Sequence, residues 1–214
     1  MLQHSELAII IPAYDEALTI EAVVKSASIY GKIIVVDDSS ADKTASIAAA
    51  AGALVVSHTD NRGYDCALNS GFEKASELGF SYVITFDADV QHNAEFLQEY
   101  IKCFEQDYDL VLGIRPVTAR WAEYCFALYT RNRYGVIDPL CGMKGYNLKT
   151  FNRYGCFDSY KSIGTELMLY SLKSNDKMIQ IKVPISKRTD KPRFGATFQA
   201  NIKIIRALFI DIFK

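Results

Sequence analysis

The sequence predicts an α/β fold in which a mostly parallel central sheet is covered by helices on both faces. Three observations predict it. Short, nearly continuous apolar runs alternate repeatedly with segments of helical periodicity over residues 7–114. Such runs are typical of strands that are buried on both faces, as in a parallel sheet. Acidic residues directly follow several of these runs, and parallel sheets bind ligands beyond the carboxyl ends of their strands.

The first half of the chain supplies this alternation. Residues 16–31 illustrate the helical pattern, because apolar residues recur on one face and Gly31 ends the segment. Gly71 weakens the same pattern in residues 63–79. The expected strands are 7–14, 32–40, 53–58, 81–89 and 108–114, and the expected helices are 16–31, 41–52, 63–79 and 93–106.

The second half is less regular. Residues 115–160 combine several arginines with many aromatic residues and show no clear alternation. Beyond them we expect further short elements but no linker or internal repeat, so residues 1–214 are predicted to form a single domain. The expected elements are a turn and strand in 138–148, a helix at 162–174, a strand at 177–185, a basic loop at 187–197 and a terminal helix at 198–214.

The overall composition restricts the partners of the protein. Lysine and arginine number 24 against 25 aspartate and glutamate residues, a balance that argues against a nucleic-acid binder. The five cysteines are scattered without a CxxC pair, which favours reduced thiols in a cytoplasmic protein. Neither a signal peptide nor an apolar stretch long enough to span a bilayer is apparent, so any membrane contact is expected to be peripheral.

Acidic residues gather at three predicted strand ends, namely Asp15 and Glu16, residues 37–40, and residues 87–91. In a parallel sheet these ends meet at one edge, where they predict a binding site. Asp87 and Asp89 flank a single alanine, and their repulsion would be relieved by a divalent cation. Carboxylate oxygens suit Mg²⁺ or Mn²⁺, which often bridge to substrate phosphates, and Gln91 can add a neutral oxygen. From this motif alone, a solvated pair of acids remains equally open.

Two familiar nucleotide-binding signatures are missing. The chain has neither a GxGxxG motif after its first strand nor a Walker A loop. The charge of a nucleotide diphosphate would therefore be met by a metal and by arginines, of which Arg115 follows the fifth predicted strand directly. A signalling receiver domain is disfavoured, because the third strand ends in Ser57 and His58 where such a domain requires an aspartate.

Taken together, the motifs resemble the inverting GT-A glycosyltransferases of family 2, and in particular the branch of dolichyl-phosphate mannosyltransferases and polyprenyl-phosphate glycosyltransferases. They occur in family order over almost the whole chain. Each motif is weak alone, whereas the ordered set is specific. The motifs are IIIPAYDEALTI (9–20), VVDDSSADKT (35–44), NRGYDCALNSGF (61–72), FDADVQHNAEFL (86–97), VLGIR (111–115), DPLCGMKGY (138–146) and VPISKRTDKPRFG (183–195).

The resemblance implies a nucleotide-binding half in residues 1–115, an acceptor-side half in 116–197 and a C-terminal amphipathic helix in 198–214. It also implies site residues. Those of the donor and metal site are Pro12, Tyr14 and Glu16 along the nucleoside, Asp38 at the base, and Asp87, Asp89 and Gln91 as metal ligands. Those expected near the donor or acceptor phosphates are Arg115, Arg131 or Arg133, and Arg193 in the late loop.

The reaction implied is metal-dependent transfer of a sugar from a GDP- or UDP-sugar to a polyprenyl phosphate. Asp89, Arg115, Arg131 and Asp138 form the expected catalytic set. A phosphate acceptor is already ionised at neutral pH, whereas a hydroxyl acceptor needs a base, for which Asp138 is a candidate. Transfer to a glycan hydroxyl in cell-surface polysaccharide synthesis therefore stays open, as does a non-catalytic protein that binds nucleotide sugars. A pyrophosphorylase is disfavoured because its glycine-rich N-terminal signature is missing.

The chain departs from the family pattern at several positions. Asp15 stands where asparagine is usual, Asp65 replaces a glycine, and Lys144 replaces a common arginine. These departures bear on the acceptor more than on the fold. Residues 198–214 carry apolar side chains at helical spacing among basic ones, so this helix either docks on its own domain or lies on the inner face of the membrane.

Overall fold

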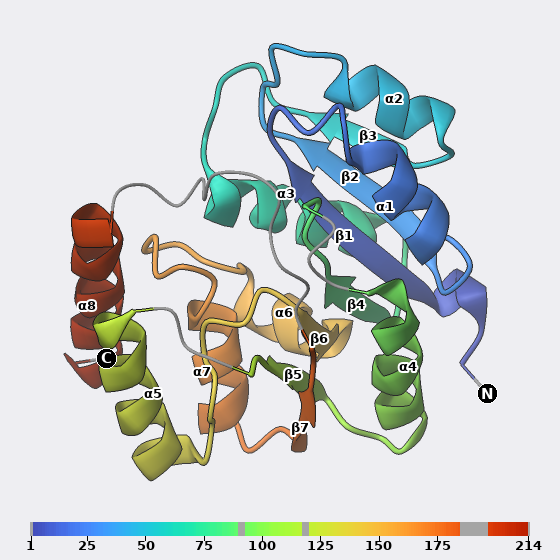
Figure 1. The fold of residues 1–214 in the computed structure, drawn as a ribbon. Helices are drawn as coiled ribbons and strands as arrows, with labels where there is room; N and C mark the ends of the chain where they lie inside the picture. The colour runs from blue at the N-terminus through green and yellow to red at the C-terminus, as the bar shows by residue number, and fades with distance from the viewer. Residues whose placement is uncertain (1, 90–92, 117–119, 185–196, 214) are drawn as a thin grey trace.

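The protein, described by a computed structural model over residues 2–89, 93–116, 120–184 and 197–213, is built on a seven-stranded sheet (Figure 1). The strand order is β3-β2-β1-β4-β6-β5-β7. Only β6 runs antiparallel to its neighbours in the described part of the chain. The predicted α/β class with a mostly parallel sheet is thereby confirmed. The strands are β1 (Leu7–Ala13), β2 (Lys32–Asp37), β3 (Leu54–Ser57), β4 (Tyr82–Thr85), β5 (Leu110–Ile114), β6 (Lys144–Asn147) and β7 (Met178–Lys182).

The register of the sheet brings the acidic segments together. In the parallel pair β1–β2, Ala13 lies beside Asp37, and in the pair β1–β4, Ile10 lies beside Thr85. The residues that follow these positions therefore leave the sheet at the same edge. This is the edge at which doubly wound sheets bind their ligands.

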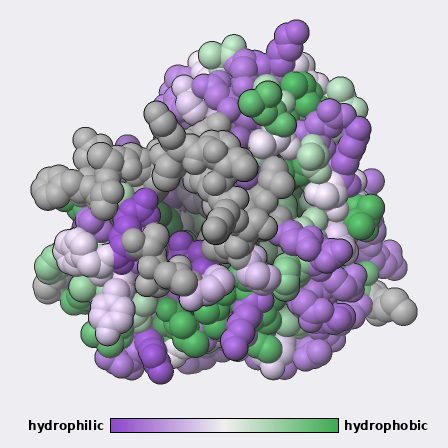
Figure 2. Space-filling model, in the orientation of Figure 1, coloured by the Kyte–Doolittle hydropathy of each residue, from purple (hydrophilic) through white to green (hydrophobic). Residues whose placement is uncertain are grey.

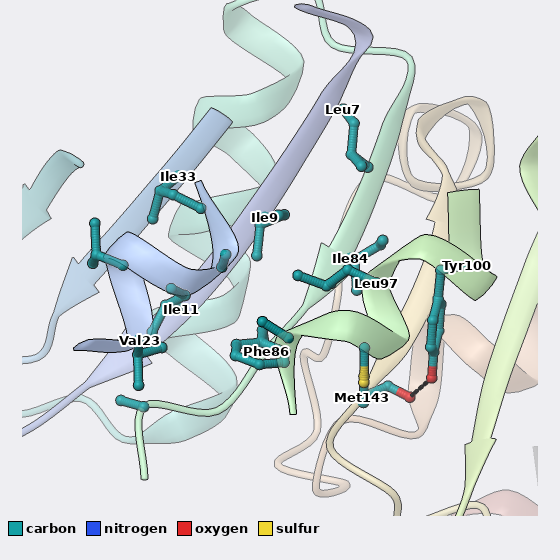
Figure 3. Packing of buried hydrophobic residues seen from close by; sticks show 14 of the residues in the cluster. Leu7, Ile9, Ile11, Val23, Ile33, Ile84, Phe86, Leu97, Tyr100 and Met143 are labelled. Carbon is teal, nitrogen blue, oxygen red and sulfur yellow. Dashed lines mark hydrogen bonds between the residues drawn. The ribbon is translucent and has the colours of Figure 1, made fainter. Parts of the chain in front are cut away.

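The first face of the sheet is covered by α1 (Ile20–Ala27), α2 (Thr44–Ala50) and α4 (Leu97–Glu105), the last preceded by a 3₁₀ turn at Ala94–Phe96 (Figure 1). Alternate residues of β1 point into this layer, where Leu7, Ile9 and Ile11 are fully buried. Figure 3 shows the packing, including the Tyr100 hydroxyl that donates to the Met143 carbonyl at 2.8 Å. Burial on both faces explains why β1 is apolar throughout.

The opposite face is covered by α3 (Tyr64–Glu77), α6 (Leu148–Tyr154) and α7 (Glu166–Lys173). Ala8 and Ile10 of β1 point into this layer. Gly71 lies in α3 where a Cβ atom would overlap the Cγ2 atom of Ile10. The glycine that weakens the helical pattern thus lets α3 approach the sheet closely.

Replacing Gly71 by alanine is expected to lower the free energy of unfolding by about 1–3 kcal/mol, because overpacking outweighs the gain in helix propensity. Urea unfolding followed by circular dichroism measures this change. Glu73→Ala, at an exposed position of the same helix, is the matched control and should have little effect. An unchanged or higher stability of Gly71→Ala would contradict this account of the packing.

Two helices were not predicted from the sequence, α5 (Trp121–Tyr134) and α6. In α5, large apolar side chains occur on the exposed as well as the buried side, while Glu123 is buried. The helical periodicity of hydrophobicity is therefore lost. Helix α6 begins directly at the end of β6 and has only seven residues. A helix of this length is too short to show a periodic pattern in the sequence.

The terminal helix α8 (Thr197–Phe213) packs beside α5 at the edge of the molecule (Figure 1). Ala122 and Phe126 of α5 meet Ile204, Ala207 and Leu208 of α8 in a small apolar cluster. The predicted helix at the end of the chain is present and docks on its own domain. Among the described helices, none has the length and apolar character needed to cross a bilayer.

Candidate functional site

A cavity of about 430 Å³ opens at the sheet edge where β1, β2 and β4 end. It receives side chains from both halves of the chain. The structure brings together seven of the residues predicted for the site, which are Pro12, Tyr14, Glu16, Asp38, Asp87, Asp89 and Arg115. The wall also contains residues that the sequence did not assign to the site, including Asn61, Gly63, Tyr64, Leu140, Cys141, Gly142, Lys144, Phe157, Ile163 and Gly164.

The segment after β1 is fixed by side-chain contacts to the segment after β2. The Asp15 carboxylate accepts a hydrogen bond from the backbone N–H of Ala41 at 2.8 Å, and the Asp15 N–H donates to Ser40 Oγ at 2.9 Å. Asp15 has a φ of 52°, a left-handed conformation that Asn and Asp tolerate better than most residues. Aspartate can therefore replace the usual asparagine here without changing the backbone beside Tyr14 and Glu16.

Asp38 follows β2 and is almost fully buried beside the cavity. Its Oδ1 lies 2.7 Å from His58 Nδ1 and accepts the Arg62 N–H at 2.9 Å, while its Oδ2 accepts the Gly63 N–H at 2.7 Å. The carboxylate thus holds residues 59–63 against the end of β2. The family resemblance implies that Asp38 also contacts the base of the nucleotide. The same carboxylate would then serve both the base and this loop.

Asp87 and Asp89 follow β4 and line the cavity, each partly exposed. The Tyr64 hydroxyl approaches Asp87 Oδ1 at 3.5 Å. Gly142 packs so closely against Asp87 that a Cβ atom would overlap Oδ2. Within the described ranges, no three His, Cys, Asp or Glu side chains are grouped to hold a metal. Two neighbouring carboxylates that line a cavity suit a hard cation that also binds substrate phosphates, so these residues fit Mg²⁺ or Mn²⁺.

Replacing Gly142 by alanine is expected to displace the Asp87 carboxylate and to weaken Mn²⁺ binding by about tenfold or more, because metal affinity depends on ligands held in place. Isothermal titration with Mn²⁺ alone measures the effect. Gly145→Ala, which crowds Phe104 and Tyr100 instead of Asp87, is the control for a purely structural change. Equal loss of affinity in both variants would show that the effect is not local to Asp87.

Arg115 follows β5 and is held by two acids. Its Nε donates to Asp138 Oδ2 at 2.7 Å, and its Nη2 donates to Asp138 Oδ1 at 2.8 Å and to Glu123 Oε2 at 3.0 Å. Burial alone would lower the pKa of Arg115, but hydrogen bonds and charge from Asp138, with the charge of Glu123, raise that pKa above its ordinary value. Nη1 of Arg115 has no acceptor among the described residues, so the cavity contains a fixed cation that can bind an anion.

Asp138 itself is 3% exposed and is not among the residues that line the cavity. Both of its carboxylate oxygens accept from Arg115, and Oδ2 also accepts the Arg115 backbone N–H at 3.0 Å. This geometry makes Asp138 a residue that positions Arg115. The structure does not bring it to the cavity as a base.

Lys144 supplies a second cation to the cavity wall. It is 3% exposed, and its Nζ donates to the Gly164 carbonyl at 2.7 Å. Burial disfavours the ammonium and lowers the pKa of Lys144 to about 8. Asp65 lies close enough to affect this charge, and burial raises the pKa of Asp65 to about 7. Asp65 and Lys144, which both depart from the family pattern, therefore lie near each other beside the cavity.

A loop held by Asp158 completes this wall. The Asp158 carboxylate accepts from the N–H groups of Ser162 and Gly164 and from Ser162 Oγ, at 2.6 to 3.0 Å. The loop places Ile163 in the cavity wall with a φ of 60°, which is unfavourable for a β-branched residue. Backbone strain of this kind clusters at functional sites.

The remaining predicted residues lie elsewhere. Arg131 is exposed in the last turn of α5 and does not line the cavity, and Arg133 is likewise exposed. Their separation from the site follows from the helix that the sequence did not reveal. Gln91 and Arg193 lie outside the described residues. Lys144 and Gly142 were missed, although both stand within the motif CGMKGY that carried the resemblance.

The fold and this cavity are those expected of a glycosyltransferase, and comparison with known proteins identifies the family. Residues 8–161 match the family described as Glycosyl transferase family 2, and the chain belongs to this family. The predicted family is confirmed and, with it, the glycosyltransferase class.

Two relatives indicate the branch. The UDP-N-acetylglucosamine–dolichyl-phosphate N-acetylglucosaminyltransferase of Methanococcus voltae is 32% identical over 171 residues, which cover 65% of this chain and 68% of the relative. The undecaprenyl-phosphate 4-deoxy-4-formamido-L-arabinose transferase of Pseudomonas paraeruginosa is 30% identical over 160 residues, which cover 65% of this chain and 46% of the relative. The chain thus spans less than half the length of the second relative.

A solved structure shares the fold. Glucosyl-3-phosphoglycerate synthase from Mycobacterium tuberculosis, in complex with Mn²⁺, UDP and glucosyl-3-phosphoglycerate, superposes with a TM-score of 0.76. The match covers 97% of this chain and 80% of that chain at 20% identity. At this identity the likeness establishes the fold alone, which is the predicted GT-A fold.

Proposed function

We propose that the protein transfers a sugar from a nucleotide-diphosphate sugar to a polyprenyl phosphate, with inversion at the anomeric carbon. The observation that carries this proposal is the pairing of two acids, Asp87 and Asp89, with two cations, the half-buried Arg115 and the buried Lys144, in one cavity at the strand ends. The acids suit a divalent cation and the cations suit phosphate oxygens. The two relatives named for polyprenyl-phosphate substrates support the acceptor.

In the donor half, Pro12, Tyr14 and Glu16 are proposed to line the nucleoside and Asp38 to contact its base. Asp87 and Asp89 would hold Mg²⁺ or Mn²⁺, with Gln91 as a further proposed ligand. When bound, the ion neutralises charge on the diphosphate leaving group. These assignments divide the chain into a nucleotide-binding half at 1–115 and an acceptor-side half at 116–197.

In the transfer step an acceptor phosphate oxygen attacks the anomeric carbon while the bond from that carbon to the nucleoside diphosphate breaks. The diphosphate leaves with the bonding electron pair. Arg115 orients the anionic groups through Nη1, and Lys144 is placed to bind a second anionic oxygen. The phosphate needs no base, and the engagement of Asp138 by Arg115 favours this acceptor over a glycan hydroxyl.

A panel of UDP- and GDP-sugars with Mg²⁺ or Mn²⁺, read by thermal shift, tests donor binding. We expect one nucleotide class to raise the melting temperature only when the metal is present. Donors that bind are then incubated with undecaprenyl phosphate, and with an oligosaccharide as the hydroxyl acceptor. Transfer to the oligosaccharide alone would overturn the proposed acceptor, and nucleotide binding without any turnover would indicate a binding protein.

A further inference from the structure

Helices α5 and α8 form an outer layer at one side of the molecule, away from the packed faces of the sheet (Figure 1). Their facing sides are buried against each other through Phe126, Ile204 and Leu208, among others. On their outer sides, by contrast, several large side chains are exposed. The nature of these outer sides is therefore informative about a partner.

Large apolar side chains lie on both outer sides. On α5 they are Trp121, Tyr124 and Leu128, whose spacing places them on one stripe and whose exposures are 63%, 63% and 49%. On α8 they are Ile202, Phe209 and Ile212, with exposures of 53%, 55% and 44%. We call these six residues, with the exposed basic residues Arg131, Lys203 and Arg206, the α5–α8 face. Pale and green atoms gather over this side of the molecule in Figure 2, with purple atoms among them.

The charges of the two helices are sorted by sign. Both acids, Glu123 on α5 and Asp211 on α8, point inward and are 3% and 8% exposed. Every exposed charge on the described parts of these helices is basic. The basic residues are Arg131 and Arg133 on α5 and Lys203 and Arg206 on α8. The Arg206 guanidinium also donates to the Tyr160 carbonyl at 3.0 Å, which ties α8 to the loop held by Asp158.

We propose that the α5–α8 face lies on the surface of a bilayer that contains anionic phospholipids. Exposed tryptophan and tyrosine favour the interface between hydrocarbon and water, and apolar stripes bordered by basic residues are typical of helices that lie in this plane. Basic residues are attracted to anionic headgroups, whereas acids on the same face would be repelled. The inward placement of both acids is the feature that favours a bilayer over a generic protein partner.

The face is connected to the cavity through shared residues. Leu140 and Ile163 line the cavity and also pack against the apolar cluster between α5 and α8. A bilayer on the outer side of the helix pair would therefore be separated from the cavity wall by the two helices and this apolar cluster. This step rests on the proposed function, because it identifies the bilayer as the source of the lipid phosphate acceptor.

Flotation with vesicles tests the proposal. The full chain is mixed with vesicles of phosphatidylcholine alone or with phosphatidylglycerol added. We expect binding to the anionic vesicles that falls as salt is raised. The double variants Trp121→Ser with Tyr124→Ser, and Arg131→Glu with Arg206→Glu, should each lower the partition coefficient by about tenfold or more. The matched control is Ile29→Ser with Leu78→Ser, which removes exposed apolar residues elsewhere and should bind like the parent.

Other outcomes would overturn the proposal. No binding to anionic vesicles, or equal loss in the control variant, excludes this face as a membrane surface. Self-association that the α5 variants abolish, seen by sedimentation equilibrium without lipid, would assign the face to a second copy of the chain. Donor binding is measured in parallel by thermal shift. Vesicle binding without donor binding would contradict the proposed function alone, and donor binding without vesicle binding would contradict this inference alone.

Discussion

Asp87→Asn is expected to reduce sugar transfer by about a thousandfold, with a similar loss for Asp89→Asn. Each change removes one of two carboxylates that line the cavity at the end of β4. A change of several kcal/mol in the barrier is the usual scale for losing the charge stabilisation that a bound metal provides, and 4 kcal/mol corresponds to about a thousandfold in rate. The turnover of the donor, measured across a titration of Mn²⁺, reports the loss.

The same variants separate metal binding from folding. In thermal shift, the parent should gain stability from nucleotide only when Mn²⁺ is present, and both variants should lose that gain while keeping the melting temperature of the protein alone. Asp60→Asn is the matched control, because Asp60 is an exposed acid that follows β3 and does not line the cavity. Full metal-dependent stabilisation of Asp87→Asn by nucleotide would remove the main support for the proposed function.

The sheet and its acidic edge could be predicted from the sequence because both depend on local patterns. The strands of the first half are nearly continuous apolar runs, and acidic residues come soon after β1, β2 and β4. Once the strands are parallel, their ends must meet. Burial of β1 on both faces, which the apolar run in residues 7–13 requires, is what the structure shows.

The other parts of the site depend on contacts between distant residues. No local pattern shows that Asp138 faces Arg115 or that Lys144 reaches the carbonyl of Gly164, since these pairs lie 23 and 20 positions apart. Helix α5 escaped prediction for a related reason. The usual pattern of buried apolar and exposed charged residues is reversed in α5, where Trp121 and Tyr124 are exposed and Glu123 is buried. The contacts on the two sides of α5 explain this reversal. Glu123 binds Arg115, and we propose that the exposed aromatic residues meet a bilayer.

Asp138→Asn is expected to lower kcat/KM for transfer to a lipid phosphate by about ten- to a hundredfold, because it loosens the guanidinium that orients the phosphates. Arg115 would retain Glu123, and the asparagine oxygen can still accept one of its hydrogen bonds. The loss should therefore be partial. Steady-state kinetics with the donor and undecaprenyl phosphate measure it.

The pH profile then distinguishes positioning from base catalysis. If Asp138 positions Arg115, the variant should be slower by the same factor at every pH between about 5 and 9, and the profile should keep its shape. If Asp138 were a base, the parent rate would fall as pH drops through the pKa of that base, and this limb would disappear in the variant. Glu123→Gln is the matched control, because Glu123 also binds Arg115 Nη2, and we expect it to reproduce the parent profile at a reduced rate. Two observations together would identify Asp138 as a base instead. They are loss of the acidic limb in the pH profile of the variant and transfer of the sugar to a glycan hydroxyl.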